Sequence, residues 1–160
     1  VWGRSEQKMR QYQDEMSADG WQVETCSAPG DVAASCNLII TATPTKTPLL
    51  TADHVKPGTH ITAMGSDSPG KQELEPGILE KADLIVADSI LQCRERGEIV
   101  HGLTSGLINE KDIIELGNIL DEKASGRTAE SQITIADLTG VAVQDIQIAK
   151  AVFEACRKGA

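Results

Sequence analysis

The sequence has few aromatic residues and no long apolar run. Its 160 residues include one Phe, one Tyr and two Trp, so a hydrophobic core must be built mainly from aliphatic side chains. Its apolar runs are only a few residues long, whereas a helix that spans a bilayer needs about 20 apolar residues. We therefore expect no membrane partner, and the length fits a single domain over residues 1–160.

Clustered positive charge is absent as well. The chain has 24 acidic and 15 basic residues, which gives a formal net charge of -9. Because nucleic-acid binding depends on clustered Lys and Arg, we expect no nucleic-acid partner.

The cysteines are few and widely spaced. The four, Cys26, Cys36, Cys93 and Cys156, form neither a C-x-x-C pair nor a Cys/His cluster with the spacing of a zinc site. We therefore expect no metal. We also expect reduced thiols, which are typical of a cytoplasmic protein.

Short apolar segments alternate with helical patterns along most of the chain. This alternation predicts an α/β fold with a doubly wound parallel sheet. The run 37–44 is continuously apolar before a polar turn, which is typical of a strand covered on both faces. The region 97–127 is expected to be polar, with only patches of helix. Strands are expected at 1–2, 21–25, 37–44, 61–64, 83–87 and 133–137, and helices at 6–19, 32–35, 51–55, 75–82 and 89–96.

Two helix boundaries carry recognisable signals. Ser5 can cap the first helix because its hydroxyl reaches the free N–H groups of the first turn, and Gly20 ends that helix. A long amphipathic helix is expected after Gly140. Its apolar stripe consists of Val141, Ile148, Val152 and Ala155, widened by Ile146, Ala149 and Phe153.

The stretch 59–74, THITAMGSDSPGKQEL, is the most informative in the chain. Residues 61–64 predict a buried strand, and a polar loop with Asp67 and Lys71 follows it. In open α/β sheets, ligands bind just beyond the carboxyl ends of strands. Asp67 can handle a proton there, or it can only hydrogen-bond its own loop as an Asx turn. Lys71 can reach Asp67 or a ligand, or it can point into solvent.

Three stretches, in this order and spacing, resemble the ornithine cyclodeaminase/mu-crystallin family. They are NLIITATPTKTPLL (37–50), GTHITAMGSDSPGKQEL (58–74) and ITIADLTGVAVQDIQIA (133–149), and residues 82–99 fit the same pattern. The resemblance implies a Rossmann-like NAD(P)-binding domain that is incomplete at its amino terminus and closes with a long C-terminal helix. It also implies a fragment of a longer protein, without the first strand, the Gly-rich turn and the N-terminal substrate and dimerisation domain.

The family is nicotinamide-dependent, so the resemblance implies an ornithine cyclodeaminase-like enzyme or an amino- or imino-acid oxidoreductase. Hydride would move at a carbon bearing nitrogen, with Asp67 as general acid or base. The expected partners are a small amino- or imino-acid substrate and, for the parent protein, a second copy in a homodimer. The alternative is a mu-crystallin-like protein that binds NADP and a ligand without turnover. A carboxylate beside the nicotinamide favours the enzyme, although the isolated fragment is expected to be inactive.

The resemblance also implies cofactor contacts at the ends of three strands. The residues expected beside the cofactor are Thr41, Ala42, Thr43, Met64, Gly65, Ser66, Lys71 and Leu138. The turn after the last strand is expected to approach the substrate through Thr139 and Gly140. Alternatively, Gly140 serves only tight packing.

Arg4 lies where the second strand of a Rossmann fold would end. An acid at that position binds the ribose hydroxyl of NAD, whereas an arginine accommodates the 2′-phosphate of NADP. Ser5 adds a hydroxyl, and the helix that it opens adds N–H groups and the positive end of a dipole. We therefore expect NADP or NAD as cofactor, with NADP favoured. The alternative is an Arg4 side chain turned to solvent.

Overall fold

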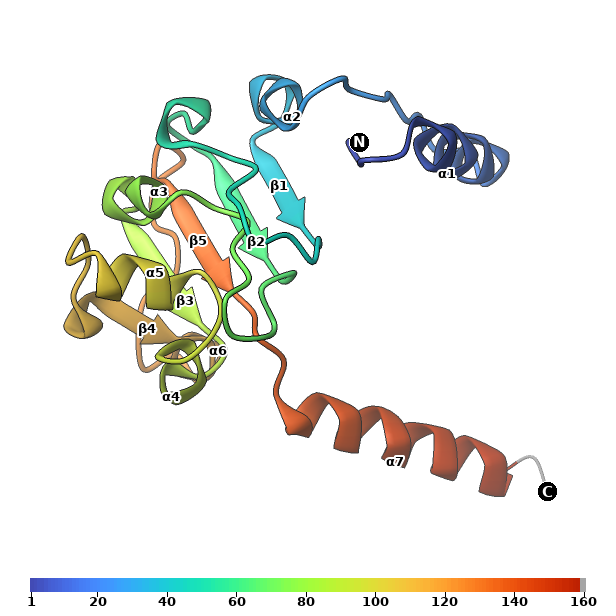
Figure 1. Cartoon of the computed structure of the whole chain (residues 1–160). Helices are drawn as coiled ribbons and strands as arrows, with labels where there is room; N and C mark the ends of the chain where they lie inside the picture. Colours follow the sequence, from blue (N-terminus) through green and yellow to red (C-terminus); the bar gives the residue numbers. More distant parts are fainter. Residues whose placement is uncertain (159–160) are drawn as a thin grey trace.

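A five-stranded, fully parallel sheet forms the centre of the molecule (Figure 1). We describe residues 1–158 of the chain in a computed structural model. The strand order is β1-β2-β5-β3-β4, so the last strand of the chain lies in the middle of the sheet. This confirms the α/β fold with a parallel sheet. The strands are β1 (Leu38–Thr41), β2 (His60–Ala63), β3 (Leu84–Ala87), β4 (Ile113–Glu115) and β5 (Thr134–Asp137).

One row of isoleucines runs across all the strands at the same level. β-Branched side chains suit a pleated surface, and burying one stabilises the fold by roughly 1.5–3 kcal/mol. If one strand shifted its register by one residue, its isoleucine would move to the other face of the sheet. The row therefore helps to fix the register of the strands. From β1 to β4 across the sheet, its members are the buried Ile39, Ile61, Ile135, Ile85 and Ile113.

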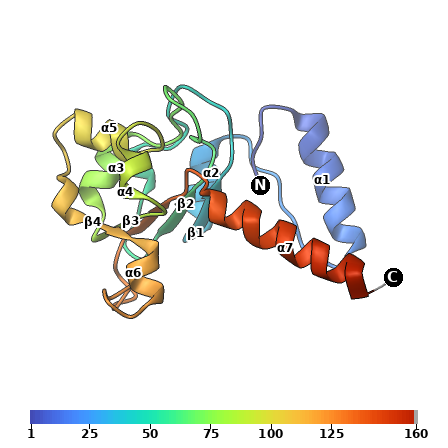
Figure 2. The same cartoon turned by 90° about the horizontal axis from the view of Figure 1, so that it is seen from below.

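Helices cover the sheet on both sides. Figure 2 shows α3 and α5 on one side and α6 on the other. Gly102 allows close packing of α5, because a Cβ there would lie 2.8 Å from Leu79 of α3. The helices are α1 (Glu6–Ala18), α2 (Pro29–Ser35), α3 (Pro76–Lys81), α4 (Ile90–Cys93), α5 (Ile99–Thr104), α6 (Leu116–Leu120) and α7 (Ala142–Lys158), with short 3₁₀ turns η1 (Ala52–His54) and η2 (Glu110–Asp112).

The amino-terminal segment lies beside the sheet without joining it (Figure 1). The predicted capping is confirmed, since the Ser5 hydroxyl accepts the N–H of Lys8 at 3.3 Å. The predicted strands at 1–2 and 21–25 are wrong. Residue Val1 exchanges hydrogen bonds with the backbone of Glu24 (2.6 Å) and Cys26 (2.8 Å), but neither segment pairs with a strand of the sheet.

The prediction that β1 is covered on both faces is also wrong. Leu38 and Ile40 are 62% and 64% exposed, while the alternating Ile39 and Thr41 are buried. A cavity of about 280 Å³ separates β1 from the segment Val1–Trp2. The strand is therefore an edge strand with one open face.

The polar region after α4 contains more regular structure than its sequence predicts. The strand β4 lies within it, although only three residues long, and pairs with β3. The sequence pattern missed β4 because three residues are too few to show a period. The helix expected at 89–96 is shorter and ends at Cys93.

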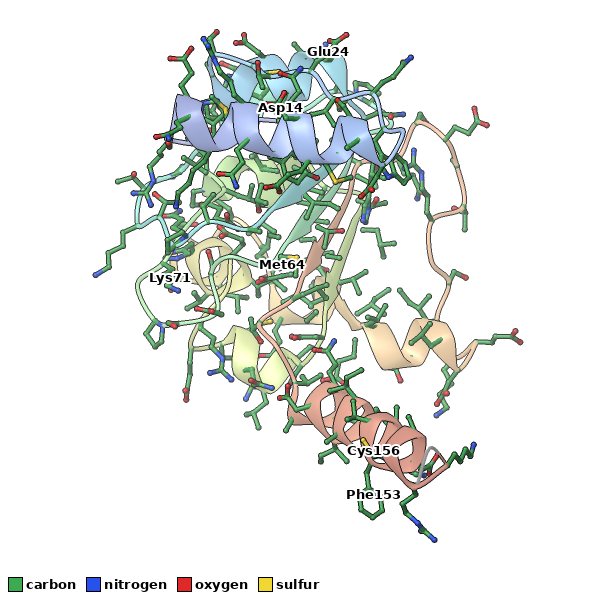
Figure 3. All side chains as sticks on the ribbon, turned by 90° about the vertical axis from the view of Figure 1, so that its right-hand side faces the viewer. Asp14, Glu24, Met64, Lys71, Phe153 and Cys156 are labelled. Carbon is green, nitrogen blue, oxygen red and sulfur yellow. The ribbon has the colours of Figure 1, made fainter. Side chains whose placement is uncertain are left out.

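The long C-terminal helix is confirmed as α7, and it projects away from the sheet (Figures 1 and 2). Its apolar side chains are exposed, and Figure 3 shows Phe153 pointing away from the helix. Within residues 1–158, no helix combines the length and the apolar character needed to cross a membrane.

Candidate functional site

The strand ends lie in register at the carboxyl edge of the sheet. In register, Thr41 of β1 lies beside Ala63 of β2, which lies beside Asp137 of β5. Because the strands are parallel, the loops that follow them meet at this edge, where α/β proteins bind ligands. The predicted site residues at the ends of β1, β2 and β5 are therefore brought together.

Asp67 and Lys71 form an ion pair on the loop after β2. The Lys71 Nζ lies 2.6 Å from Asp67 Oδ1, and the Asp67 side chain is 56% exposed whereas that of Lys71 is 23% exposed. Ser68 donates a second hydrogen bond to the same oxygen at 2.8 Å. The hydrogen bond from Lys71 lowers the pKa of Asp67, with smaller contributions from Ser68 and the charge of Arg96. At neutral pH, Asp67 is thus an accessible carboxylate able to accept a proton.

Met64 and Gly65 lie where β2 meets this loop. Figure 3 shows Met64 near the middle of the sheet edge, with Lys71 to one side. Gly65 can only be glycine, since a Cβ there would lie within 2.5 Å of Thr43 and Glu73. Met64 is exposed, as a cofactor contact requires.

A buried carboxylate, Glu73, ties β1 to β2. It accepts hydrogen bonds from the hydroxyls of Thr41 and Thr43 at 2.7 Å each, from the Thr43 N–H at 2.5 Å and from the Gly65 N–H at 2.9 Å. The hydroxyls that we expected beside the cofactor are therefore directed to an internal acid. Ala42, between them, remains exposed.

A second buried carboxylate, Glu98, lies next to Glu73. Its oxygens accept the N–H groups of Glu73 (2.7 Å) and Leu74 (2.9 Å), and the hydroxyl of the buried Ser66. Burial raises the pKa of Glu98, although these hydrogen bonds act in the opposite direction. The Ser66 side chain is thus directed inward.

Asp137, the last residue of β5, receives the backbone of Glu98. Its Oδ2 accepts the N–H groups of Glu98 at 2.7 Å and Ile99 at 2.8 Å. Burial raises the pKa of Asp137 to about 7, and the neighbouring charges of Glu98 and Asp88 add to this rise. Three buried acids thus lie in series between β1 and β5.

The turn after β5 is held by Asp88, which follows β3. Asp88 accepts the hydroxyl of Thr139 at 3.1 Å and the N–H of Gly140 at 2.8 Å. Gly140 has φ +86° and no atom near its missing Cβ, so the turn conformation requires it rather than packing. Leu138 is half-buried beside this turn.

Arg4 lines two cavities near the end of β1. The larger, of about 640 Å³, has a cation, a carboxylate, hydroxyls and an indole ring among its walls. The smaller, of about 100 Å³, connects Arg4 to the residues 42–45. Within residues 1–158, Arg4 forms no ion pair. The larger cavity is lined by Trp2, Gly3, Arg4, Glu6, Met9, Thr25, Cys26 and Ser27.

A cation, hydroxyls and an indole ring are groups that could hold the adenosine half of a dinucleotide. A free arginine beside hydroxyls and at the start of α1 favours a phosphate group. Among the described residues, no group of three or more His, Cys, Asp or Glu could hold a metal ion.

Four acids at this edge escaped the sequence analysis. Asp88 directly follows β3 and Asp137 ends β5, so both lie at the carboxyl ends of strands, the same kind of position that marks Asp67 in the sequence. No local pattern marks Glu98, because its side-chain partners lie 24 to 32 residues away in the sequence. Glu73 likewise binds Thr41, the last residue of β1, and Thr43 just after it, which lie 32 and 30 positions away.

The parallel sheet, its crossover helices and the polar carboxyl edge define a Rossmann-like α/β protein. Over residues 1–160, the chain matches the ornithine cyclodeaminase/mu-crystallin family, and it belongs to that family.

Its relatives include several nicotinamide-dependent enzymes. The chain is 40% identical over 127 residues to the alanine dehydrogenase of Archaeoglobus fulgidus, covering 79% of this chain and 39% of the relative. The iminosuccinate reductase of Paracoccus denitrificans, solved in complex with NAD+, superposes with a TM-score of 0.90 at 36% identity, over 99% of this chain and 48% of that one. The Δ(1)-pyrroline-2-carboxylate reductase of Thermococcus litoralis, in complex with NADH and L-proline, superposes with a TM-score of 0.93 at 26% identity. The match covers 100% of this chain and 50% of that one. The chain thus spans about half the length of these relatives or less.

Proposed function

We propose that this chain is the cofactor-binding part of a longer NAD(P)-dependent enzyme that acts on small amino or imino acids. The observation that carries the proposal is the Asp67–Lys71 ion pair of 2.6 Å, exposed at the carboxyl edge of the sheet. Family membership and the relatives support the same class of reaction. Because the chain spans about half of its relatives, the substrate-binding half is proposed to lie outside residues 1–160.

In the proposed reaction, a bound nicotinamide would supply or take up the hydride at a carbon bearing nitrogen. Asp67 accepts a proton from the amine, or from a water that attacks the imine, because it is an exposed carboxylate that is ionised at neutral pH. Once protonated, it can return that proton in the reverse direction. Lys71 holds the carboxylate in place and stabilises its charge.

The proposed cofactor path runs along the strand ends. Arg4 and Ser5 bind the adenosine end, and Arg4 favours the 2′-phosphate of NADP. The backbone at 41–43 and at 64–66 follows, since the side chains of Thr41, Thr43 and Ser66 are engaged internally. Leu138 lines the same edge, and Thr139 and Gly140 approach the substrate.

We further propose a homodimeric parent protein located in the cytoplasm. The exposed apolar face of α7 supports an interface with the rest of the protein or with a second copy. All four cysteines are unpaired, as is usual in a reducing compartment.

An assay of the full-length protein tests the enzymatic class. Alanine, ornithine and Δ(1)-pyrroline-2-carboxylate are offered in turn with oxidised or reduced cofactor, and both nicotinamide absorbance and ammonia release are followed. A dehydrogenase or reductase changes the absorbance, whereas a cyclodeaminase releases ammonia without net change in the cofactor. Binding of cofactor and amino acid without conversion would overturn the proposal in favour of a ligand-binding protein of the mu-crystallin kind.

A further inference from the structure

One buried carboxylate holds both ends of the loop that carries the Asp67–Lys71 pair. At the first end, the Ser66 hydroxyl donates to Glu98. At the second end, the N–H groups of Glu73 and Leu74 donate to the two oxygens of Glu98, at 2.7 and 2.9 Å. The residues 67–72 therefore form a loop closed at its base by a single side chain.

Gly97, which precedes α5, and His101, within α5, add two further contacts to this loop. The Gly97 N–H donates to the carbonyl of Ser66 at 2.8 Å, and His101 Nε2 lies 2.8 Å from the carbonyl oxygen of Lys71. The tip of the loop lacks such support: Gly70 has φ +78° and no atom within 4 Å of its missing Cβ. The position of Lys71 thus depends on the base of the loop, together with the His101 contact and the hydrogen bond from the Gln72 N–H to the Thr45 carbonyl at 3.0 Å.

Glu98 is itself placed by the central strand. Asp137 at the end of β5 accepts the N–H groups of Glu98 and Ile99, so it fixes the backbone that presents the Glu98 side chain. Gly97 must be glycine at this point, because a Cβ would lie 2.4 Å from the Asp137 carboxylate. The sheet, through Asp137 and then Glu98, sets where the loop begins and ends.

We propose that Glu98 is a positioning residue, which closes the loop 66–74 so that Lys71 stays beside Asp67 at the carboxyl edge of the sheet. The inference rests on the proposed function, in which this pair faces the bound substrate. Glu98 is buried, at 1% exposure, and its side chain contacts Ser66, Glu73 and Leu74, so it acts through the loop. Asp137 holds the backbone that carries Glu98, because it accepts the N–H groups of Glu98 and Ile99.

A direct readout is the titration of the Asp67 carboxyl group in the full-length protein. Aspartate labelled with ¹³C at the carboxyl carbon is followed by NMR, and the Asp67 signal is assigned by its loss in Asp67→Asn. The charged and polar groups that face Asp67 are Lys71, Ser68 and Arg96, and Lys71 has the largest effect. If the loop loosens and Lys71 moves away, the pKa of Asp67 must rise toward its ordinary value.

Glu98→Gln is the informative variant because it keeps the shape but places an NH₂ group against an N–H of the loop base. We expect the Asp67 pKa to rise and turnover to fall by about 10- to 100-fold, the order expected for a misplacement of about 1 Å, with cofactor affinity nearly unchanged. In a Lys71→Met background, Glu98→Gln should leave the Asp67 pKa where Lys71→Met alone puts it. The control, Glu95→Gln, changes an exposed acid three positions away and should alter neither quantity.

An Asp67 pKa in folded Glu98→Gln equal to that of the unmodified protein would overturn the proposal. If Glu98→Gln does not fold, Ser66→Ala removes one end of the closure only, and an unchanged Asp67 pKa there also overturns it. The catalytic proposal fails separately: normal turnover in Asp67→Asn would remove the proton-transfer role of Asp67 without changing the titration result. A purely structural Glu98 predicts lost stability with no shift of the Asp67 pKa.

Discussion

The backbone N–H of Glu98 donates to the Asp137 carboxylate at 2.7 Å, although the two side chains are both buried acids. The hydrogen bond favours the charged form of Asp137, whereas burial and the Glu98 charge oppose it. Burial has the largest effect, so the pKa of Asp137 is raised from 3.8 to about 7. At neutral pH, Asp137 is therefore partly protonated, whereas in an unfolded chain it would be fully ionised.

Asp137 should make the protein less stable as pH rises from about 4 to about 7. In that window the folded state binds the proton and the unfolded state does not, so the free energy of unfolding falls with rising pH. The rise in pKa from 3.8 to about 7 corresponds to roughly 4 kcal/mol, at about 1.4 kcal/mol per unit. In Asp137→Asn this contribution is absent.

Urea unfolding of the full-length protein near pH 5 and near pH 8 measures the effect. The loss of stability between the two pH values should be clearly smaller in Asp137→Asn than in the unmodified protein. Asp121→Asn, which changes an exposed acid paired with Lys123, serves as control and should lose as much stability between the two pH values as the unmodified protein. An equal loss in all three proteins would show that the pKa of Asp137 is not raised by folding.

Gly97→Ala should destabilise the protein more than Gly106→Ala does. Both glycines have positive φ, +85° and +72°, so alanine costs about 1–2 kcal/mol at either site. Only at Gly97 would the new methyl group also meet the Asp137 carboxylate, which adds about 1–3 kcal/mol of overpacking. Denaturant unfolding compares the two variants, and equal losses would contradict the close approach of Gly97 to Asp137.

Arg4→Ala should weaken NADPH binding by about 10- to 100-fold and change NADH binding little. One charge-assisted hydrogen bond contributes about 1.5–3 kcal/mol, and only NADPH has the 2′-phosphate that would receive it. Fluorescence titration of the full-length protein with both cofactors measures the two affinities. Arg94→Ala, which changes an exposed arginine paired with Glu110 and lines neither cavity, is the matched control. NADH binding as tightly as NADPH, unaffected by Arg4→Ala, would exclude the NADP preference.

The sequence predicted the parts of the fold that depend on local pattern. The Ser5 cap, the strand that ends at Ala63 and the helix α7 all follow from short-range preferences. The strands predicted at 1–2 and 21–25 do not form, because the local sequence pattern does not reveal whether a neighbouring strand is available for pairing. The open face of β1 escaped prediction for the same reason: Leu38 and Ile40 are as apolar as buried strand residues.

The candidate site was predicted only where it is exposed and contiguous in the sequence. Asp67 and Lys71 are four residues apart, and their pairing follows from the loop alone. The inward direction of the Thr41 and Ser66 hydroxyls could not be predicted, since it depends on acids brought close by the fold. Long-range pairing of this kind leaves no periodic signal in the chain.

Hydride transfer by Asp67→Asn in the full-length protein tests the central claim most directly. The substitution keeps the shape of the side chain and removes the carboxylate that accepts the proton. We expect single-turnover hydride transfer to be about 100- to 10,000-fold slower, the range expected for general acid–base catalysis, with cofactor affinity and melting temperature nearly unchanged. Hydride transfer at a normal rate in a stable Asp67→Asn protein would exclude Asp67 as the proton acceptor.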